Sequence, residues 1–214
     1  MSGEGSETNN LIAELSADLQ PQSPMRHPFL RALPWIALSV GYIVVVTMVI
    51  GVRHDWAIKM AQPTHLFEIM LAASVAITAA LSSFWMCVPA MKGQVSFKAV
   101  PVTLFGVFLV WVFCRATVEG INPDHMYLNH CLYEALFLGV IPAIALIALC
   151  KAGTTVQPNW MAAMNVLAVT MMGWIALRFT CGGDSLGHAF VYHFFPFLVF
   201  AFLMAVAARR LFKW

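Results

Sequence analysis

The length, composition and charge of this chain are typical of a membrane protein. Of its 214 residues, 61% are hydrophobic and 10% are charged, whereas about a quarter of the residues in soluble domains are charged. A soluble core could not bury this much apolar surface, so the composition excludes an ordinary soluble domain. The net charge of +2 is too small to indicate nucleic-acid binding.

Residues 1–28 form a polar, acidic segment, which we predict to be a cytoplasmic tail. The stretch 1–8 is rich in Gly, Ser and Glu and is predicted to be disordered. Asn9 and Asn10 can cap a helix that ends before Pro21. Its apolar residues Leu11, Ile12, Leu15 and Leu19 recur at helical spacing, whereas Asp18 stands apart from this stripe.

A helix of about ten residues is too short to be stable alone in water. Two interpretations follow for this tail helix. It can dock on its own membrane domain or on lipid headgroups, although its acidic polar face suits headgroups poorly. Alternatively, it can fold in the groove of another protein.

Six apolar runs follow, each of which we expect to cross a hydrocarbon core of ~30 Å. They are predicted at about 33–52, 66–88, 99–114, 131–150, 160–177 and 189–208. Arg115, at the end of the third and shortest run, is expected to extend toward the membrane surface. The fold class is therefore an all-α membrane protein with six transmembrane helices, divided into a tail (1–28) and a membrane domain (29–214).

The lysines and arginines of the short loops predict the orientation of these helices. Eight lie on one side of the membrane and four on the other. The side with eight holds both termini, since the number of spans is even. Both termini are therefore predicted to be cytoplasmic.

This orientation gathers metal-binding side chains on the outer face. Cys131 lies in the first turn of the fourth helix, where the helix dipole favours a thiolate. Cys181 precedes Gly182-Gly183, in a turn that we expect to be open and exposed. The candidate sensing or metal-binding residues are Cys131, Cys181, His130, Glu134, Asp184, His188 and His193.

Each of these residue types also has a purely structural interpretation. Cysteines in membrane helices are often small buried hydrophobes, and we interpret Cys87, Cys114 and Cys150 in this way. His193 can be a histidine whose hydrogen bonds are satisfied inside the bundle. The sequence alone leaves this alternative open for His193.

Several of these elements together resemble one known family. They are the tail helix with Pro21 behind it, the six-helix domain, Cys131, the segment Cys181-Gly182-Gly183-Asp184-Ser185, His193 and the basic end at 209–214. The chain resembles the NrsF family, negative regulators of sigma F, over essentially its whole length. The tail contains no cysteine and no histidine cluster, which separates it from soluble zinc-containing anti-sigma factors.

The resemblance implies a multi-pass anti-sigma factor of the bacterial inner membrane, without enzymatic activity. It implies that the tail sequesters an extracytoplasmic-function sigma factor and releases it on heavy-metal or oxidative stress. The sigma-binding residues would be Leu11, Ile12, Leu15, Asp18 and Leu19. The sensing thiols would be Cys131 and Cys181. No obligatory cofactor is expected, although a thiophilic ion of the Cd, Zn or Hg class can bind transiently at these two thiols.

Two other functions compete with this one. The outer cysteines also suit a membrane thiol oxidoreductase that reduces quinone, but such an enzyme usually has two reactive thiol pairs. A small metal transporter is a weaker alternative, because few ionisable residues are expected at mid-membrane. Detection of dithiol-dependent quinone reduction by the purified protein would favour the enzyme.

Overall fold

The computed structural model describes residues 4–17, 25–88, 93–119, 131–151, 153, 155–183 and 185–212. Across these residues the regular structure is entirely helical, which confirms the predicted all-α class. The elements in chain order are α1 (Glu4–Ala17), α2 (Pro28–Ile50), α3 (Trp56–Met60), α4 (Pro63–Met86), α5 (Ser96–Glu119), α6 (Cys131–Lys151), α7 (Pro158–Thr180), α8 (Leu186–His188), the π-helix η3 (Ala189–Phe194) and α9 (Phe195–Phe212).

Prolines determine where three of the long helices begin. Pro28, Pro63 and Pro158 occupy the first turn of α2, α4 and α7. Proline is favoured there because its fixed φ suits a helix and its missing N–H would have no partner within the helix. At the start of α2, the Nδ1 atom of His27 also accepts a hydrogen bond from the backbone N–H of Phe29 at 3.4 Å.

Six helices are long and apolar enough to cross a membrane, as the sequence predicts. They are Pro28–Ile50, Pro63–Met86, Ser96–Val118, Cys131–Lys151, Pro158–Thr180 and Val191–Phe212. The third is longer than the predicted 99–114. The prediction stopped before Arg115 and expected this side chain at the membrane surface, whereas its Nη1 atom points inward and contacts Glu68 Oε2 at 2.5 Å.

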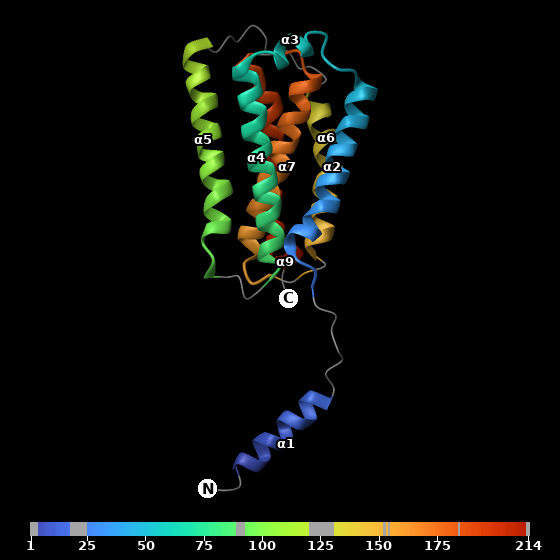
Figure 1. Ribbon diagram of the computed structural model, residues 1–214, viewed down its shortest axis with the longest axis vertical. Coiled ribbons are helices and arrows are strands. Elements are labelled where there is room, and N and C mark those ends of the chain that lie inside the picture. The colour runs from blue at the N-terminus through green and yellow to red at the C-terminus, as the bar shows by residue number, and fades with distance from the viewer. Residues whose placement is uncertain are drawn as a thin grey trace.

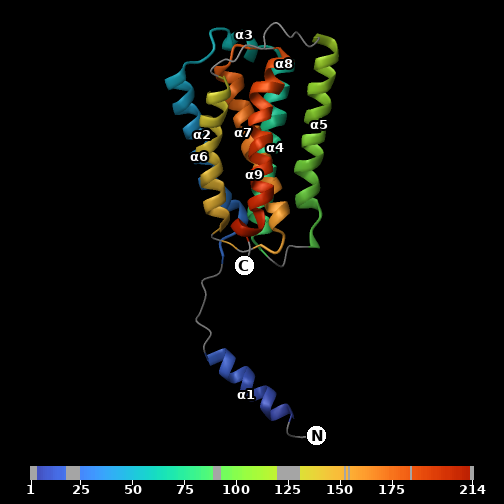
Figure 2. The same ribbon diagram turned by 180° about the vertical axis from the view of Figure 1, so that it is seen from behind.

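The helices form an upright bundle (Figures 1 and 2). We call the end at which α2 begins and α9 ends the proximal end, and the opposite end the distal end; the distal end is at the top of both views. α4 and α7 are the most buried spans, at 61% and 72% of their apolar windows, whereas only 17% of the window in α5 is buried. α5 accordingly stands at the margin of the bundle.

Small residues allow close packing at the centre of the bundle. Ala72, Ala76 and Ala80 of α4 are fully buried in the two main hydrophobic clusters. On α7, a Cβ at Gly173 would lie 2.2 Å from the Phe197 ring. Any larger residue at position 173 would therefore push α7 and α9 apart.

The first helix extends away from the bundle in both views (Figures 1 and 2). It begins at Glu4, so the prediction of disorder is wrong for residues 4–8, residues 1–3 lie outside the described residues, and the predicted cap at Asn9-Asn10 is wrong. Helix-compatible residues such as Glu7 extend it by more than a turn before Leu11. Leu11, Ile12 and Leu15 are more than half exposed. Two of the predicted partner-binding residues, Asp18 and Leu19, lie outside the described residues.

Candidate functional site

The two candidate sensing cysteines meet at the distal end. Cys131 is the first residue of α6, and Cys181 directly follows the end of α7. A short connection at the proximal end joins these helices as an antiparallel pair, so the start of α6 lies beside the end of α7. The two Sγ atoms are 2.8 Å apart, and both thiols are free.

Both thiols are buried, which corrects the prediction of an open and exposed site. Cys131 and Cys181 are 7% and 5% exposed, and they pack with Tyr192 in a small cluster. The sequence pattern could not reveal this cover, because Tyr192 arrives from the π-helix near the end of the chain. The Cys181 turn is therefore closed over the thiols.

Two histidines complete the cluster. His188 Nε2 lies 3.2 Å from Cys181 Sγ, and one ligand atom from each of Cys131, Cys181, His188 and His193 can be chosen so that all lie within 4.8 Å of one another. Residues five apart on an α-helix point about 140° apart. The π-helix η3 has a wider turn with i→i+5 bonds, which brings His193 round toward His188, with ring centroids 5.3 Å apart.

Gly183 is required for this arrangement. A Cβ at residue 183 would lie 2.7 Å from His188 Cδ2. Its backbone N–H also donates a hydrogen bond to Cys181 Sγ at 3.4 Å. Glycine thus lets the turn approach the imidazole closely enough to bring His188 onto the thiols.

The electrostatics of the cluster favour a thiolate on Cys181. The pKa of Cys181 lies well below that of an ordinary thiol, because the Cys131 thiol donates a hydrogen bond to its sulfur and His188 makes a second contact. The sequence placed the thiolate on Cys131 at the helix dipole. The tight pairing of the sulfurs allows only one of them to carry the charge readily, and the contact with His188 favours Cys181.

His193 is only 1% exposed, and neither ring nitrogen has a hydrogen-bond partner within the described residues. Among the described residues, the alternative of an interior histidine with satisfied hydrogen bonds therefore gains no support. A buried polar group without a partner costs stability. Two thiols and two imidazoles form a common ligand set for zinc-like ions, so the unpaired ring nitrogen suits a bound cation.

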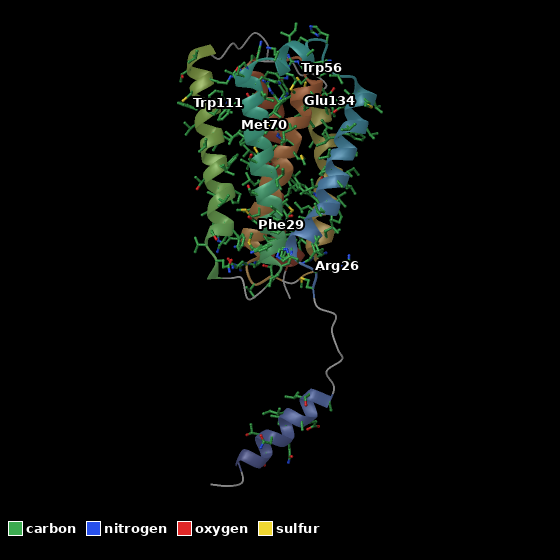
Figure 3. The ribbon with its side chains drawn as sticks, in the orientation of Figure 1. Arg26, Phe29, Trp56, Met70, Trp111 and Glu134 are labelled. Atoms are coloured by element: carbon green, nitrogen blue, oxygen red, sulfur yellow. The ribbon has the colours of Figure 1, made fainter. Side chains whose placement is uncertain are left out.

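The other candidate ligands do not join this group. Glu134 of α6 is half-buried near the distal end (Figure 3), where its Oε2 accepts a hydrogen bond from Thr180 Oγ1 at 3.3 Å. It is not one of the four clustered ligands. His130 and Asp184 lie outside the described residues.

Arg53 is a functional candidate that the sequence reasoning missed. It lies between α2 and α3, and its Nη1 donates a hydrogen bond to the backbone carbonyl of Cys181 at 3.0 Å. Its backbone N–H donates to the carbonyl of Phe179, also at 3.0 Å. Asp55 holds the guanidinium at 2.6 Å, and this contact keeps the pKa of the Asp55 carboxyl below its usual value. Arg53 therefore ties the end of α2 to the cysteine turn.

A buried ion-pair network lies beside the cluster and was also missed. Glu68 of α4 is 1% exposed. Its carboxylate contacts Arg115 Nη1 at 2.5 Å and Arg178 Nε at 3.1 Å, and it accepts a hydrogen bond from Trp174 Nε1 at 2.9 Å. A carboxylate inside an apolar run signals a specific partner, and this signal was available from the sequence. The network joins α4, α5 and α7 at the level of the cysteines.

A family model described as NrsF, negative regulator of sigma F, matches residues 15–214. This match covers nearly all of the chain and includes the whole bundle. The comparisons with curated proteins and with solved structures found no match.

Proposed function

Because the chain belongs to the NrsF family of negative regulators of sigma F, we propose that it is an anti-sigma factor of the bacterial inner membrane. Its tail sequesters an extracytoplasmic-function sigma factor. Heavy-metal or oxidative stress at Cys131 and Cys181 then releases that factor. Since a sigma factor works in the cytoplasm, the proximal end faces the cytoplasm and the cysteine site faces the periplasm. The family's role is regulatory and not enzymatic.

The exposed face of α1 is the main support for the sigma-binding role. Leu11, Ile12 and Leu15 lie on one side of the helix and remain more than half exposed. An amphipathic helix with such a stripe suits an apolar groove on a partner. Docking of this helix on its own bundle would have buried these residues, so the partner interpretation is favoured. In this proposal Asp18 and Leu19 extend the same contact.

The four-ligand cluster supports the sensing role. A tetrahedral ion bound by two thiolates at about 2.3 Å holds their sulfurs roughly 3.8 Å apart, whereas a disulfide holds them about 2.05 Å apart. The separation of 2.8 Å lies between these values. Either event therefore changes the contact between the start of α6 and the end of α7. In this proposal His188 and His193 hold the ion with the cysteines, and a part in sensing for Glu134, His130 and Asp184 stays a prediction.

The energy required is within the range of such a site. Moving a two-state equilibrium from 1:99 to 99:1 takes about 5.5 kcal/mol of differential binding. Four-ligand structural zinc sites reach apparent values of about 10–16 kcal/mol. A thiophilic ion of the Cd, Zn or Hg class can thus supply the switch without an obligatory cofactor.

The Arg53 contact supplies a physical route from the sensor to the tail. A change in the Cys181 turn alters the carbonyl that Arg53 binds. Arg53 follows the distal end of α2, and the proximal end of α2 leads to the tail. α2 is therefore the rigid element that links the thiol site with the sigma-binding segment.

The test compares three full-length proteins purified from detergent-solubilised membranes. The doubly substituted Leu11→Asp/Leu15→Asp protein loses the sigma factor that co-purifies with the original chain. Asn10→Ser, an exposed position on the other side of α1, is the matched control and retains it. Equal capture by all three proteins would show that α1 is not the binding segment.

A second experiment addresses the sensor. Cys131→Ser/Cys181→Ser still captures the sigma factor, but its target genes no longer respond to cadmium. Cys114→Ser, which alters an exposed thiol on α5, is the control and responds normally. A normal cadmium response in the double variant would rule out sensing by the two thiols.

A further inference from the structure

A second thiol pair lies at the proximal end of the bundle. Cys87 directly follows α4, and Cys150 is the next-to-last residue of α6. The Cys87 thiol donates a hydrogen bond to the carbonyl oxygen of Cys150, with Sγ and the oxygen 3.6 Å apart, and the interaction with the Cys150 side chain lowers the pKa of Cys87. Both cysteines are fully buried and neither is in a disulfide. The pair connects two helices that are remote in sequence.

The guanidinium of Arg31 lies beside this pair. A Cβ at Gly153 would lie 3.0 Å from Arg31 Nη2, 2.7 Å from Cys87 Cβ and 3.2 Å from Cys87 Sγ. Glycine at 153 therefore lets the guanidinium and the thiol meet across a bare backbone. Arg31 contributes to the lowered pKa of Cys87 through its charge and a hydrogen bond. A thiolate at Cys87 is thus stabilised, and the thiolate is the reactive form of cysteine.

The surroundings of this pair favour oxidation over metal binding. Within the described residues, no third histidine, cysteine or carboxylate ligand gathers near these two thiols, in contrast to the distal four. The Arg31 guanidinium repels a metal cation. The same positive charge stabilises the Cys87 thiolate, and it would also stabilise an anion such as hydroxide that leaves when the thiolate is oxidised. The two pairs therefore differ in chemistry although both are buried dithiols.

We propose that Cys87 and Cys150 are a peroxide-responsive dithiol that closes a reversible disulfide between the proximal ends of α4 and α6. The Cys87 thiolate attacks one oxygen of hydrogen peroxide, the O–O bond breaks, and hydroxide leaves to take up a proton as water. The Cys150 thiol then attacks the sulfur of the Cys87 sulfenic acid. The S–O bond breaks, a second water leaves, and the S–S bond forms. Cellular thiols reduce it again.

The site is also connected to the tail. Arg31 Nη1 donates a hydrogen bond to Met25 Sδ at 2.7 Å, and Met25 lies in the segment that leads from α1 into α2. Disulfide formation removes the thiolate that faces Arg31. The contact of Arg31 with Met25 then changes at the base of the sigma-binding segment. Phe29 and Arg26, labelled in Figure 3, mark this end of α2.

Access to the buried pair comes through the end of α4. Cys87 is the capping residue of that helix, and its N–H bonds only to Phe84 and Trp85. Terminal helical turns open with little free energy, and the small size of peroxide lets it enter such an opening. The cytoplasmic location of the pair rests on the proposed function, whereas its chemistry does not.

The test uses the full chain in detergent, with Cys114→Ser, Cys131→Ser and Cys181→Ser, so that only the proximal pair remains. After hydrogen peroxide treatment, the intact protein loses the mass of two hydrogen atoms, and dithiothreitol restores it. A further Cys150→Ser substitution makes Cys87 gain oxygen instead. Arg31→Gln slows disulfide formation roughly three- to tenfold, because the positive charge that favours the Cys87 thiolate is lost; Arg31→Lys retains most of the rate.

Two results would overturn the inference. One is a folded three-serine protein that keeps both thiols in peroxide while Cys87 reacts freely with peroxide after unfolding. The other is disulfide formation at the same rate in Arg31→Gln. Capture of the sigma factor by this three-serine protein is measured in a separate experiment. A failure to capture it would count against the proposed function, whereas the mass measurement would still report the chemistry of the two thiols.

Discussion

The guanidinium of Arg53 donates a hydrogen bond to the backbone carbonyl of Cys181 at 3.0 Å, which joins residues 128 positions apart. This contact places the end of the first membrane helix on the turn that carries the candidate sensing thiol. It also makes that turn dependent on a residue outside the four candidate ligands. Binding and response can therefore be separated by mutation.

Arg53→Gln is expected to uncouple the two events. The variant retains cadmium binding by the distal cluster, because no ligand changes, but it no longer releases the sigma factor. The loss of a charged hydrogen bond costs about 1.5–3 kcal/mol of stability. Calorimetric titration with cadmium and sigma-factor co-purification measure the two effects. Lys59→Gln, at the same end of the bundle, is the control, and normal release by Arg53→Gln would contradict the coupling.

Glu68→Gln is expected to destabilise the bundle strongly. The substitution leaves the charges of Arg115 and Arg178 without their shared carboxylate. Removing one partner of a buried ion pair typically costs about 3–5 kcal/mol. Chemical denaturation in detergent measures this cost. Glu134→Gln, a half-buried carboxylate that accepts one hydrogen bond, is the control and costs about 1 kcal/mol; equal losses would refute a special role for the network.

His193→Leu is expected to weaken cadmium binding about tenfold or more, comparable to the loss of a supporting ligand contact. Because its ring nitrogens have no hydrogen-bond partner in the described structure, the same change raises the stability of the ion-free protein. Higher stability of the ion-free protein together with weaker cadmium binding is expected if His193 is a metal ligand. It is not expected if His193 only packs against its neighbours. Thermal unfolding with and without cadmium measures both. A loss of stability in the ion-free protein would contradict this assignment.

The pH dependence of stability should carry the signature of Cys181. Its pKa is lower in the folded chain than the ordinary thiol value of about 8.5. Between the two values the unfolded chain binds more protons, so the contribution of Cys181 to stability increases as pH rises through this window. It is lost as pH falls through the lowered pKa. Denaturation at a series of pH values, compared with Cys181→Ser, isolates this contribution; identical pH slopes for both proteins would refute it.

The membrane fold could be predicted from the sequence because its signals are local. Long apolar runs give the six spans, and their alternating direction brings the start of α6 to the end of α7. The family match over residues 15–214 confirms the predicted resemblance. The sensing roles of Cys131 and Cys181 and the partner-binding role of the tail remain predictions.

What the sequence could not give depends on contacts between distant elements. The burial of the cysteine pair comes from Tyr192, and the convergence of His188 and His193 comes from a π-helical turn that has no simple sequence period. From the sequence, Arg115 at the end of an apolar run is expected to extend to the membrane surface. Only the structure shows that it pairs with Glu68 of another helix. The earlier start of α1 reflects the weak signal of polar helix-forming residues, which are also common in disordered tails.

A single helix, α6, carries a cysteine near each end. Cys131 and Cys150 are separated by about 28 Å at 1.5 Å per residue, which is too far for any direct contact between the two thiols. At its distal end α6 contacts the end of α7 through Cys131 and Cys181, and at its proximal end it contacts the end of α4 through Cys150 and Cys87. A disulfide or a bound ion at one end of α6 would restrict the tilt of the whole helix. Because the helix is continuous, this restriction would reach the thiol pair at its other end.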